Sequence, residues 1–218
     1  MKKIRVAVLC GGKSAEHEVS INSARNIIAA LDPKKYDVTL IGIDKQGRWH
    51  LGNSVKLLGS HEVHHISGTE GLALMPGKSS ELFLDAAQKQ WLQPIDVVFP
   101  VLHGPHGEDG TVQGLLKLAN IPFVGTGVLG SAVCMDKDVM KRLLREAGLP
   151  IPKFLVYNRR DVAKINFENV SAQLGLPCFI KPANLGSSVG ISKVRNQQEF
   201  AAAVDAAFLY DNKIIIEE

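Results

Sequence analysis

Continuous apolar runs and one amphipathic stretch alternate along the first part of the chain. The apolar runs are IRVAVLC and YDVTLIGID, and between them EVSINSARNIIAAL carries apolar residues at nearly helical spacing and stops at Pro33. Apolar runs without polar alternation are typical of parallel strands that are covered on both faces. The order strand, helix, strand returns in IDVVFPVLHG, TVQGLLKLAN and IPFVGTG. The pattern predicts an α/β fold with an open, mostly parallel sheet, and only short strands or turns in residues 46–77.

The pattern changes near Gly127. MDKDVMKRLLREAG predicts a helix, with Asp136 as its N-cap and Gly148 as its C-terminal stop. Two extended runs joined by a short glycine-serine loop then predict a hairpin, and helices flank it. The expected strands are KFLVY, PCFIKP, GISKV and KIIIEE, and the expected helices are FENVSAQLG and QQEFAAAVDAAFL. This is an α+β unit, so we expect two domains, residues 1–126 and 127–218.

Composition narrows the class of protein. Hydrophobic residues make up 45% and charged residues 22%, as in an ordinary soluble globular protein. The net charge is +3 and the basic residues are dispersed, which gives no reason to expect a nucleic-acid or membrane partner. No apolar stretch reaches the roughly 18 residues of a spanning helix, and no signal-peptide pattern is present. We therefore expect a cytoplasmic protein. The cysteines Cys10, Cys134 and Cys178 lie in or beside apolar runs and are expected to be buried free thiols.

The stretch AVLCGGKSAEHEVS raises the question of a phosphate-binding P-loop, because it contains Gly12-Lys13-Ser14. A P-loop needs an earlier glycine where this chain has Ala7, inside the strand, so we reject that interpretation. The G-x-G-x-x-G spacing of dinucleotide-binding proteins is also missing. What remains is a strand, a tight glycine turn and a helix that begins near Glu18 with its amides facing the turn. Such a turn can hold a ligand of another kind.

A second candidate site is FIKPANLGSSVGISKV. The hairpin tip, residues 186–190, is small and rich in backbone and hydroxyl donors, so it can fold over phosphate oxygens. Lys181 stands at the end of the apolar strand, and Pro182 keeps the following backbone extended. The alternative is a plain surface hairpin with a lysine that reaches into solvent.

Several histidines, serines and cysteines are further candidates for a site. His103 and Glu108 follow a parallel strand and precede a helix, where open α/β sheets bind ligands. The spacing of His103 and His106, and the cluster HEVHH at 61–65, could suggest zinc, but no further ligand stands at a suitable spacing in a rigid element. No general base is evident beside the serines and cysteines, so we expect no covalent nucleophile.

Four segments together resemble the D-alanine-D-alanine ligases of the ATP-grasp superfamily: GGKSAEHEVS, LHGPHGEDG, MDK with its helix ending in AGLPIP, and FIKPANLGSSVGISKV. The resemblance implies a Rossmann-like pre-ATP-grasp domain, then an α+β ATP-grasp small lobe, with the C-terminal ATP-grasp lobe missing. It also implies a homodimeric enzyme of peptidoglycan synthesis that joins two D-alanines. ATP would phosphorylate the first carboxylate, the second amine would attack the acyl phosphate, and two Mg²⁺ ions would assist.

The resemblance also implies roles for individual residues. Glu16 would hold the ammonium of the first D-alanine and Ser187 would bond to Glu16, so both are assigned to catalysis. His103 would lie near the D-alanine site, and Glu108 would help to position it. The residues assigned to ATP are Lys137, Lys181, Ser187, Ser188, Glu217 and Glu218, with the lysines on the phosphates and Glu217 on the adenine amino group. From the residues alone, Glu16 and Glu108 could instead be acids that complement a helix dipole, and Lys137 a solvated helix lysine.

Other functions stay open at this point. The resemblance places the Mg²⁺ ligands in a C-terminal portion that this sequence does not contain, so we expect no metal ligand in this chain and little turnover from these 218 residues alone. One alternative is a non-catalytic protein that binds D-alanine or nucleotide on the same scaffold. Another is an ATP-grasp ligase for a different acid and amine. Dipeptide and depsipeptide formation are not distinguished by the sequence.

Overall fold

The computed structural model describes residues 2–51, 63, 71–76, 82–86 and 88–218. The chain divides into two compact units, Met1–Ser131 and Ala132–Glu218, and each is described by itself. The division falls inside helix α4 (Val128–Met135), which the sequence pattern did not predict. None of the described helices is long and apolar enough to cross a membrane.

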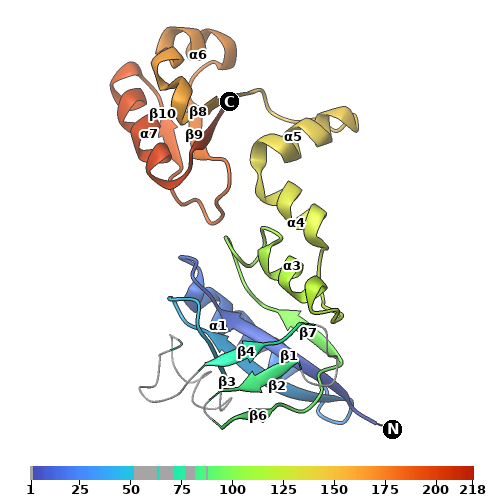
Figure 1. Cartoon of the computed structure of the whole chain (residues 1–218). Helices are drawn as coiled ribbons and strands as arrows, with labels where there is room; N and C mark the ends of the chain where they lie inside the picture. The colour runs from blue at the N-terminus through green and yellow to red at the C-terminus, as the bar shows by residue number, and fades with distance from the viewer. Residues whose placement is uncertain (1, 52–62, 64–70, 77–81, 87) are drawn as a thin grey trace. The chain divides into compact units, whose positions relative to one another are not determined.

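The first unit is built on a four-stranded sheet in the order β3-β2-β1-β7 (Figure 1). Its strands are β1 (Ile4–Gly11), β2 (Tyr36–Ile43), β3 (Trp49–Leu51) and β7 (Val97–Pro100). The central strand β1 runs parallel to both β2 and β7, while β3 is antiparallel to β2. The prediction of a mostly parallel sheet is therefore confirmed, with an antiparallel strand at one edge.

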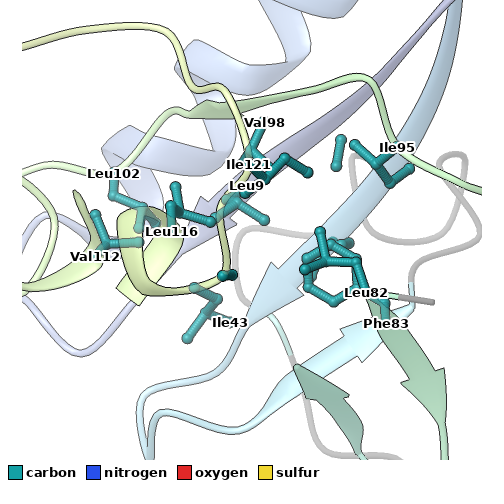
Figure 2. Packing of buried hydrophobic residues seen from close by; sticks show 13 residues of the cluster. Leu9, Ile43, Leu82, Phe83, Ile95, Val98, Leu102, Val112, Leu116 and Ile121 are labelled. Carbon is teal, nitrogen blue, oxygen red and sulfur yellow. The ribbon is translucent and has the colours of Figure 1, made fainter. Parts of the chain in front are cut away.

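Both faces of this sheet are covered, because alternate residues of β1 enter two different cores. Val6, Val8 and Cys10 pack in one cluster with residues of α1 (His17–Ala30). Ala7 and Leu9 belong to the other, which includes residues of α3 (Thr111–Leu118). Figure 2 shows this second cluster, where Leu9 and Val98 lie close to Leu116. Burial on both faces explains why the strand reads as a continuous apolar run.

Two short features of the first unit differ from the sequence pattern. IPFVGTG does not form a full strand, since Phe123 makes an isolated parallel bridge with Val98. The unit also contains a three-stranded antiparallel sheet of β4 (Leu72–Leu74), β5 (Phe83–Asp85) and β6 (Gln90–Trp91). The sequence pattern predicted short strands in the region of β4, but it did not predict β5 and β6. Strands of two or three residues are too short to show an alternating pattern.

The second unit is an antiparallel sheet in the order β10-β9-β11-β8. Its strands are β8 (Phe154–Asn158), β9 (Cys178–Pro182), β10 (Ser192–Val194) and β11 (Lys213–Glu217), all close to their predicted ranges. Helices α6 (Phe167–Leu174) and α7 (Gln197–Tyr210) share one apolar core with these strands. A short 3-10 helix, Arg159–Lys164, follows β8 and was not predicted.

Helix α5 (Lys137–Glu146) begins as the sequence predicts, because the Asp136 side chain accepts hydrogen bonds from the amides of Asp138 and Val139.

The expectation for the cysteines is wrong in part. Cys10 and Cys178 are buried and free, but Cys134 is exposed and free. Ser131 is the buried residue of α4, so the apolar letters around Cys134 do not belong to a buried helix face.

Candidate functional sites

The glycine turn after β1 is tight because it packs against the end of β2. Gly11 and Gly12 have φ angles of 88° and 98°, in the left-handed region that favours glycine. A Cβ on Gly11 would overlap the carbonyl oxygen of Ile43, and the Gly12 amide donates a 2.8 Å hydrogen bond to that same oxygen. Gly11 is therefore needed for chain packing, and Gly12 for the left-handed backbone of the turn.

A buried serine joins this turn to the neighbouring strand. Ser20, on α1, is fully buried; its hydroxyl accepts a 2.8 Å hydrogen bond from the Gly11 amide and donates to the Val101 carbonyl. Gly11 ends β1 and Val101 directly follows β7. One hydroxyl thus connects the carboxyl ends of two parallel strands, where an open sheet forms its ligand sites.

His17 holds the same turn from the other side. This fully buried side chain has Nδ1 2.7 Å from the Gly12 carbonyl oxygen, and its Nε2 accepts a 3.0 Å hydrogen bond from the Val63 amide. A carbonyl oxygen only accepts and an amide only donates, so Nδ1 donates to Gly12 and Nε2 accepts from Val63. Sequence reasoning missed both His17 and Ser20, and the available signal was two polar residues three positions apart on a buried helix face.

Glu16 lies just before α1, and its carboxylate reaches a loop from a distant part of the chain. A Cβ placed on Gly104 would lie 2.8 Å from Glu16 Oε2, which puts the carboxylate directly against the Gly104 backbone. The Glu16 amide donates a 3.1 Å hydrogen bond to the Ser14 hydroxyl. The structure therefore brings together two of the segments that the sequence singled out, at the N-terminal end of a helix.

The loop between β7 and α3 is held by its own carboxylates. Glu108 Oε2 accepts a 2.7 Å hydrogen bond from the Gly104 amide. Asp109 accepts 2.9 Å hydrogen bonds from the amides of His106 and Thr111. Burial would raise the pKa of Asp109, but these backbone hydrogen bonds lower it below its ordinary value. Within this network Glu108 positions the Gly104 backbone, beside His103.

His103 comes from the first residues of this loop. Its Nε2 lies 3.1 Å from the hydroxyl of Ser23, which is on α1. A cavity of about 310 Å³ opens between the glycine turn and the loop. His103, Leu102 and Gly107 line it from the loop. Trp49 and Val112 contribute apolar walls. The volume is within the range of small-molecule sites.

In the second unit, the charged side chains gather on the sheet face away from α6 and α7. Strand pairing sets Lys181 opposite Ile215 and Glu217 opposite Phe179. The residues between them, such as Ile180 and Ile216, enter the helical core. Lys181 and Glu217 therefore share the other face, where Lys181 Nζ donates a hydrogen bond to Glu217 Oε1.

Helix α5 adds two more lysines to this face. Lys141 Nζ lies 2.9 Å from Glu217 Oε2 in an ion pair, and the Lys141 side chain is nearly buried. The Lys137 amide donates a 3.0 Å hydrogen bond to the Ala183 carbonyl, while its ammonium donates to the Leu185 carbonyl. Lys137 is therefore no solvated helix lysine. Sequence reasoning missed Lys141, although it stands one helical turn after Lys137.

The pKa shifts agree with a positively charged cluster around one ionised carboxylate. Burial, and next the charge of Lys181, lower the pKa of Lys137, and Glu217 partly offsets them. Burial would raise the pKa of Glu217, but the hydrogen bond from Lys181 and the contact with Lys141 lower it below its ordinary value. The carboxylates of Asp211 and Asp136 also act on Lys137. Three ammonium groups gathered in this way can bind a polyanion such as a triphosphate.

The hairpin tip has a strained backbone. Ser187 and Ser188 have φ angles of 50° and 62°, an uncommon region for residues other than glycine. Gly190 has a φ of 70°, and a Cβ there would lie 2.7 Å from the Tyr210 ring and 2.8 Å from Pro182 Cγ. The tip is therefore a turn whose shape depends on Gly190, as the glycine-serine composition predicts.

Glu218, the pair of Ser187 and Glu16, and the possible metal ligands remain to be compared with the structure. Glu218 Oε1 accepts a 3.0 Å hydrogen bond from the Lys153 amide, which ties β11 to the chain before β8. The proposed bond between Ser187 and Glu16 would join the two units and stays a prediction. The described residues contain no group of three or more His, Cys, Asp or Glu side chains that could hold a metal ion. The cluster HEVHH lies outside the described residues apart from Val63.

Comparison with known proteins decides the family. Residues 5–126 match the model of the D-ala D-ala ligase N-terminus, and residues 143–218 match that of the D-ala D-ala ligase C-terminus. The chain belongs to the D-alanine-D-alanine ligase family. The family prediction from the sequence is thereby confirmed.

Individual ligases of this family are similar over the whole chain. The chain is 51% identical to D-alanine--D-alanine ligase A of Escherichia coli K12, over 100% of this chain and 61% of that protein. It is also 51% identical to a D-alanine--D-alanine ligase of Shouchella clausii, over 100% of this chain and 60% of that protein. The chain therefore spans about three-fifths of the length of these relatives.

Solved ligase structures share the fold. The D-alanine-D-alanine ligase from Coxiella burnetii has a TM-score of 0.87 and 35% identity, covering 100% of this chain and 62% of that one. The VanG D-Ala:D-Ser ligase from Enterococcus faecalis has a TM-score of 0.85 and 37% identity, covering 100% and 63%. These likenesses confirm an α/β protein with parallel and mixed sheets, while the boundary after residue 126 and the assignment of individual lobes stay predictions.

Proposed function

We propose that the protein is an ADP-forming ligase that joins two D-alanines through an acyl phosphate, for peptidoglycan synthesis. The observation that carries this proposal is the contact between Glu16 and Gly104. It places a carboxylate at the carboxyl end of a parallel sheet, beside a loop that carries His103 and Glu108. Homologous ligases that match the whole chain support the same reaction.

In this proposal the first unit binds the first D-alanine. The Glu16 carboxylate pairs with the substrate ammonium in a charge-assisted hydrogen bond, at a helix N-terminus that favours negative charge. His103, held by Ser23, lies beside that substrate. Glu108 holds the Gly104 backbone against Glu16, so it acts on the substrate through the loop.

The second unit binds ATP. Lys137 and Lys181 neutralise the phosphates, and the tip with Ser187 and Ser188 closes over them. Glu217 accepts a hydrogen bond from the adenine amino group, with Glu218 next to it. The γ-phosphoryl group passes to the carboxylate of the first D-alanine and ADP leaves; the amine of the second D-alanine then attacks the acyl carbon and phosphate leaves. Stabilising the moving charge is the main contribution that such lysines can make.

Mg²⁺ belongs to this proposal as the partner of ATP, where it would neutralise phosphate charge. Among the described residues, no group of three or more His, Cys, Asp or Glu side chains could hold the ion. A homodimer, a cytoplasmic location and low turnover by these 218 residues alone are further parts of the proposal. The likeness to a D-Ala:D-Ser ligase makes D-serine the first alternative second substrate to test.

Binding and turnover together test the proposal. Glu16→Gln should raise the D-alanine concentration needed for binding, and for ADP release where turnover is measurable, far more than it raises the ATP concentration. Glu18→Gln is a matched control, because exposed Glu18 pairs with Lys45 on the surface. Equal effects of Glu16→Gln on D-alanine and ATP would count against the ligand role. A panel of amino acids in which D-alanine shows no preference would overturn the proposed substrate.

A further inference from the structure

Two lysines from different elements share the carboxylate of Glu217. Lys181 comes from β9 and Lys141 from α5, and the side chains of Lys141 and Glu217 are each 10% exposed. Removing one partner of a buried ion pair leaves an uncompensated charge, which is strongly destabilising. The carboxylate of Glu217 therefore needs at least one of the two lysines at all times.

The two lysines contact different oxygens of this carboxylate. Lys181 donates a hydrogen bond to Oε1, and Lys141 Nζ lies 2.9 Å from the buried Oε2. Each ammonium also lies 5.7 Å from the centre of an aromatic ring, Phe154 for Lys141 and Phe179 for Lys181. Lys141 is thus enclosed between the strand carboxylate and an aromatic ring.

Lys181 is the member that can leave. Its side chain is 19% exposed, about twice as much as that of Lys141, and the charge of Lys181 acts on the neighbouring ammonium of Lys137. Two ammonium groups that repel each other gain from a polyanion placed between them. A phosphate would therefore compete with Glu217 for Lys181.

We propose that Lys141 is a positioning residue that keeps Glu217 ionised and in place when Lys181 turns away to bind a nucleotide phosphate. The inference rests on the proposed function only in taking Lys181 as a phosphate ligand. Without Lys141, Lys181 is the sole counter-charge of a buried carboxylate, and each binding event would uncover that carboxylate. Lys141 thereby raises phosphate affinity without contacting phosphate.

The test is a double-mutant cycle on the whole chain. Inorganic tripolyphosphate is the probe, and calorimetry measures its binding. Lys141→Met should weaken tripolyphosphate binding on the order of tenfold. In a Glu217→Gln background the same substitution should change binding by less than about twofold, because no carboxylate is left to uncover. Lys141→Arg should restore most of the affinity, and exposed Lys153→Met is the control for the loss of one positive charge.

Equal weakening by Lys141→Met in both backgrounds would mean that Lys141 binds phosphate directly, and it would overturn the inference; so would the absence of any effect.

A second readout needs no nucleotide. Acetylation of lysines followed by mass spectrometry should show Lys181 less reactive in Lys141→Met than in the unaltered chain, because Glu217 then holds Lys181 alone. Unchanged reactivity contradicts the inference. Failure of the unaltered chain to bind tripolyphosphate or ATP, with Lys181 protected as expected, would instead contradict the proposed nucleotide site.

Discussion

The Glu16 carboxylate lies against the backbone of Gly104, so a methyl group on Gly104 would be 2.8 Å from Glu16 Oε2. The φ angle of Gly104 is 69°, where a side chain is strained even in open space. This contact joins the helix that follows the glycine turn to the loop that follows β7. It is the reason why two short motifs, distant in sequence, form one candidate substrate site.

Gly104→Ala should weaken D-alanine binding and lower the free energy of unfolding by about 1 kcal/mol or more, through the strained φ angle and the clash with Glu16. Calorimetry with D-alanine and urea unfolding measure the two effects. Gly114→Ala is the matched control, since a Cβ there would meet no described atom within 4 Å beyond its neighbours and the backbone of α3, where alanine favours a helix. Unaltered D-alanine binding in Gly104→Ala would contradict the proposed site.

Ser20→Ala should destabilise the protein by about 1–3 kcal/mol, because it leaves the Gly11 amide and the Val101 carbonyl buried without their partner. Chemical denaturation of Ser20→Ala and of the unaltered protein measures this loss of unfolding free energy. Ser171→Ala, where the hydroxyl bonds to a carbonyl near the surface, should cost far less. Equal losses of stability in the two variants would show that the buried bridge is not special.

Asp44 should contribute an acid-dependent term to stability. Burial would raise the pKa of this 1% exposed carboxyl, but hydrogen bonds from His50 and Arg48 lower it to about 2. The unfolded pKa is about 3.9, so the folded state prefers the ionised form. This stabilisation is present above pH 4 or so and is lost as the pH falls through the folded pKa.

The measurement for Asp44 is the free energy of unfolding between roughly pH 2 and 6, the interval that spans both pKa values. Asp44→Asn should be less stable near neutral pH, and its deficit should shrink towards pH 2. Exposed Asp205→Asn should follow the unaltered protein throughout. A deficit of Asp44→Asn that does not depend on pH would show that shape, not charge, makes Asp44 important.

The three thiols should react at different rates. Cys134 is exposed and should be alkylated by iodoacetamide in the folded protein, whereas Cys10 and Cys178 should react only after unfolding. Burial raises the pKa of the Cys10 thiol to about 12, which further suppresses its thiolate. Peptide mass spectrometry at intermediate times identifies the order, and early modification of Cys10 would contradict its burial.

The amino-acid sequence by itself determined the order of the main strands and helices, the N-cap at Asp136, the parallel centre of the first sheet and the family. Each of these depends on neighbours within one element or on a run of motif letters, so a local pattern carries it. Cys134 shows the limit, because apolar letters around a residue do not reveal whether its helix face is covered.

Tertiary structure decided which side chains meet. The Glu16 and Gly104 contact, the Ser20 bridge from Gly11 to Val101, and the place of Lys141 beside Glu217 each join elements far apart in the chain. No local pattern records such pairs, since helix packing and strand register set them. The chemistry of both candidate sites therefore follows from long-range packing, although residues such as Glu16 and Lys181 were visible in motifs.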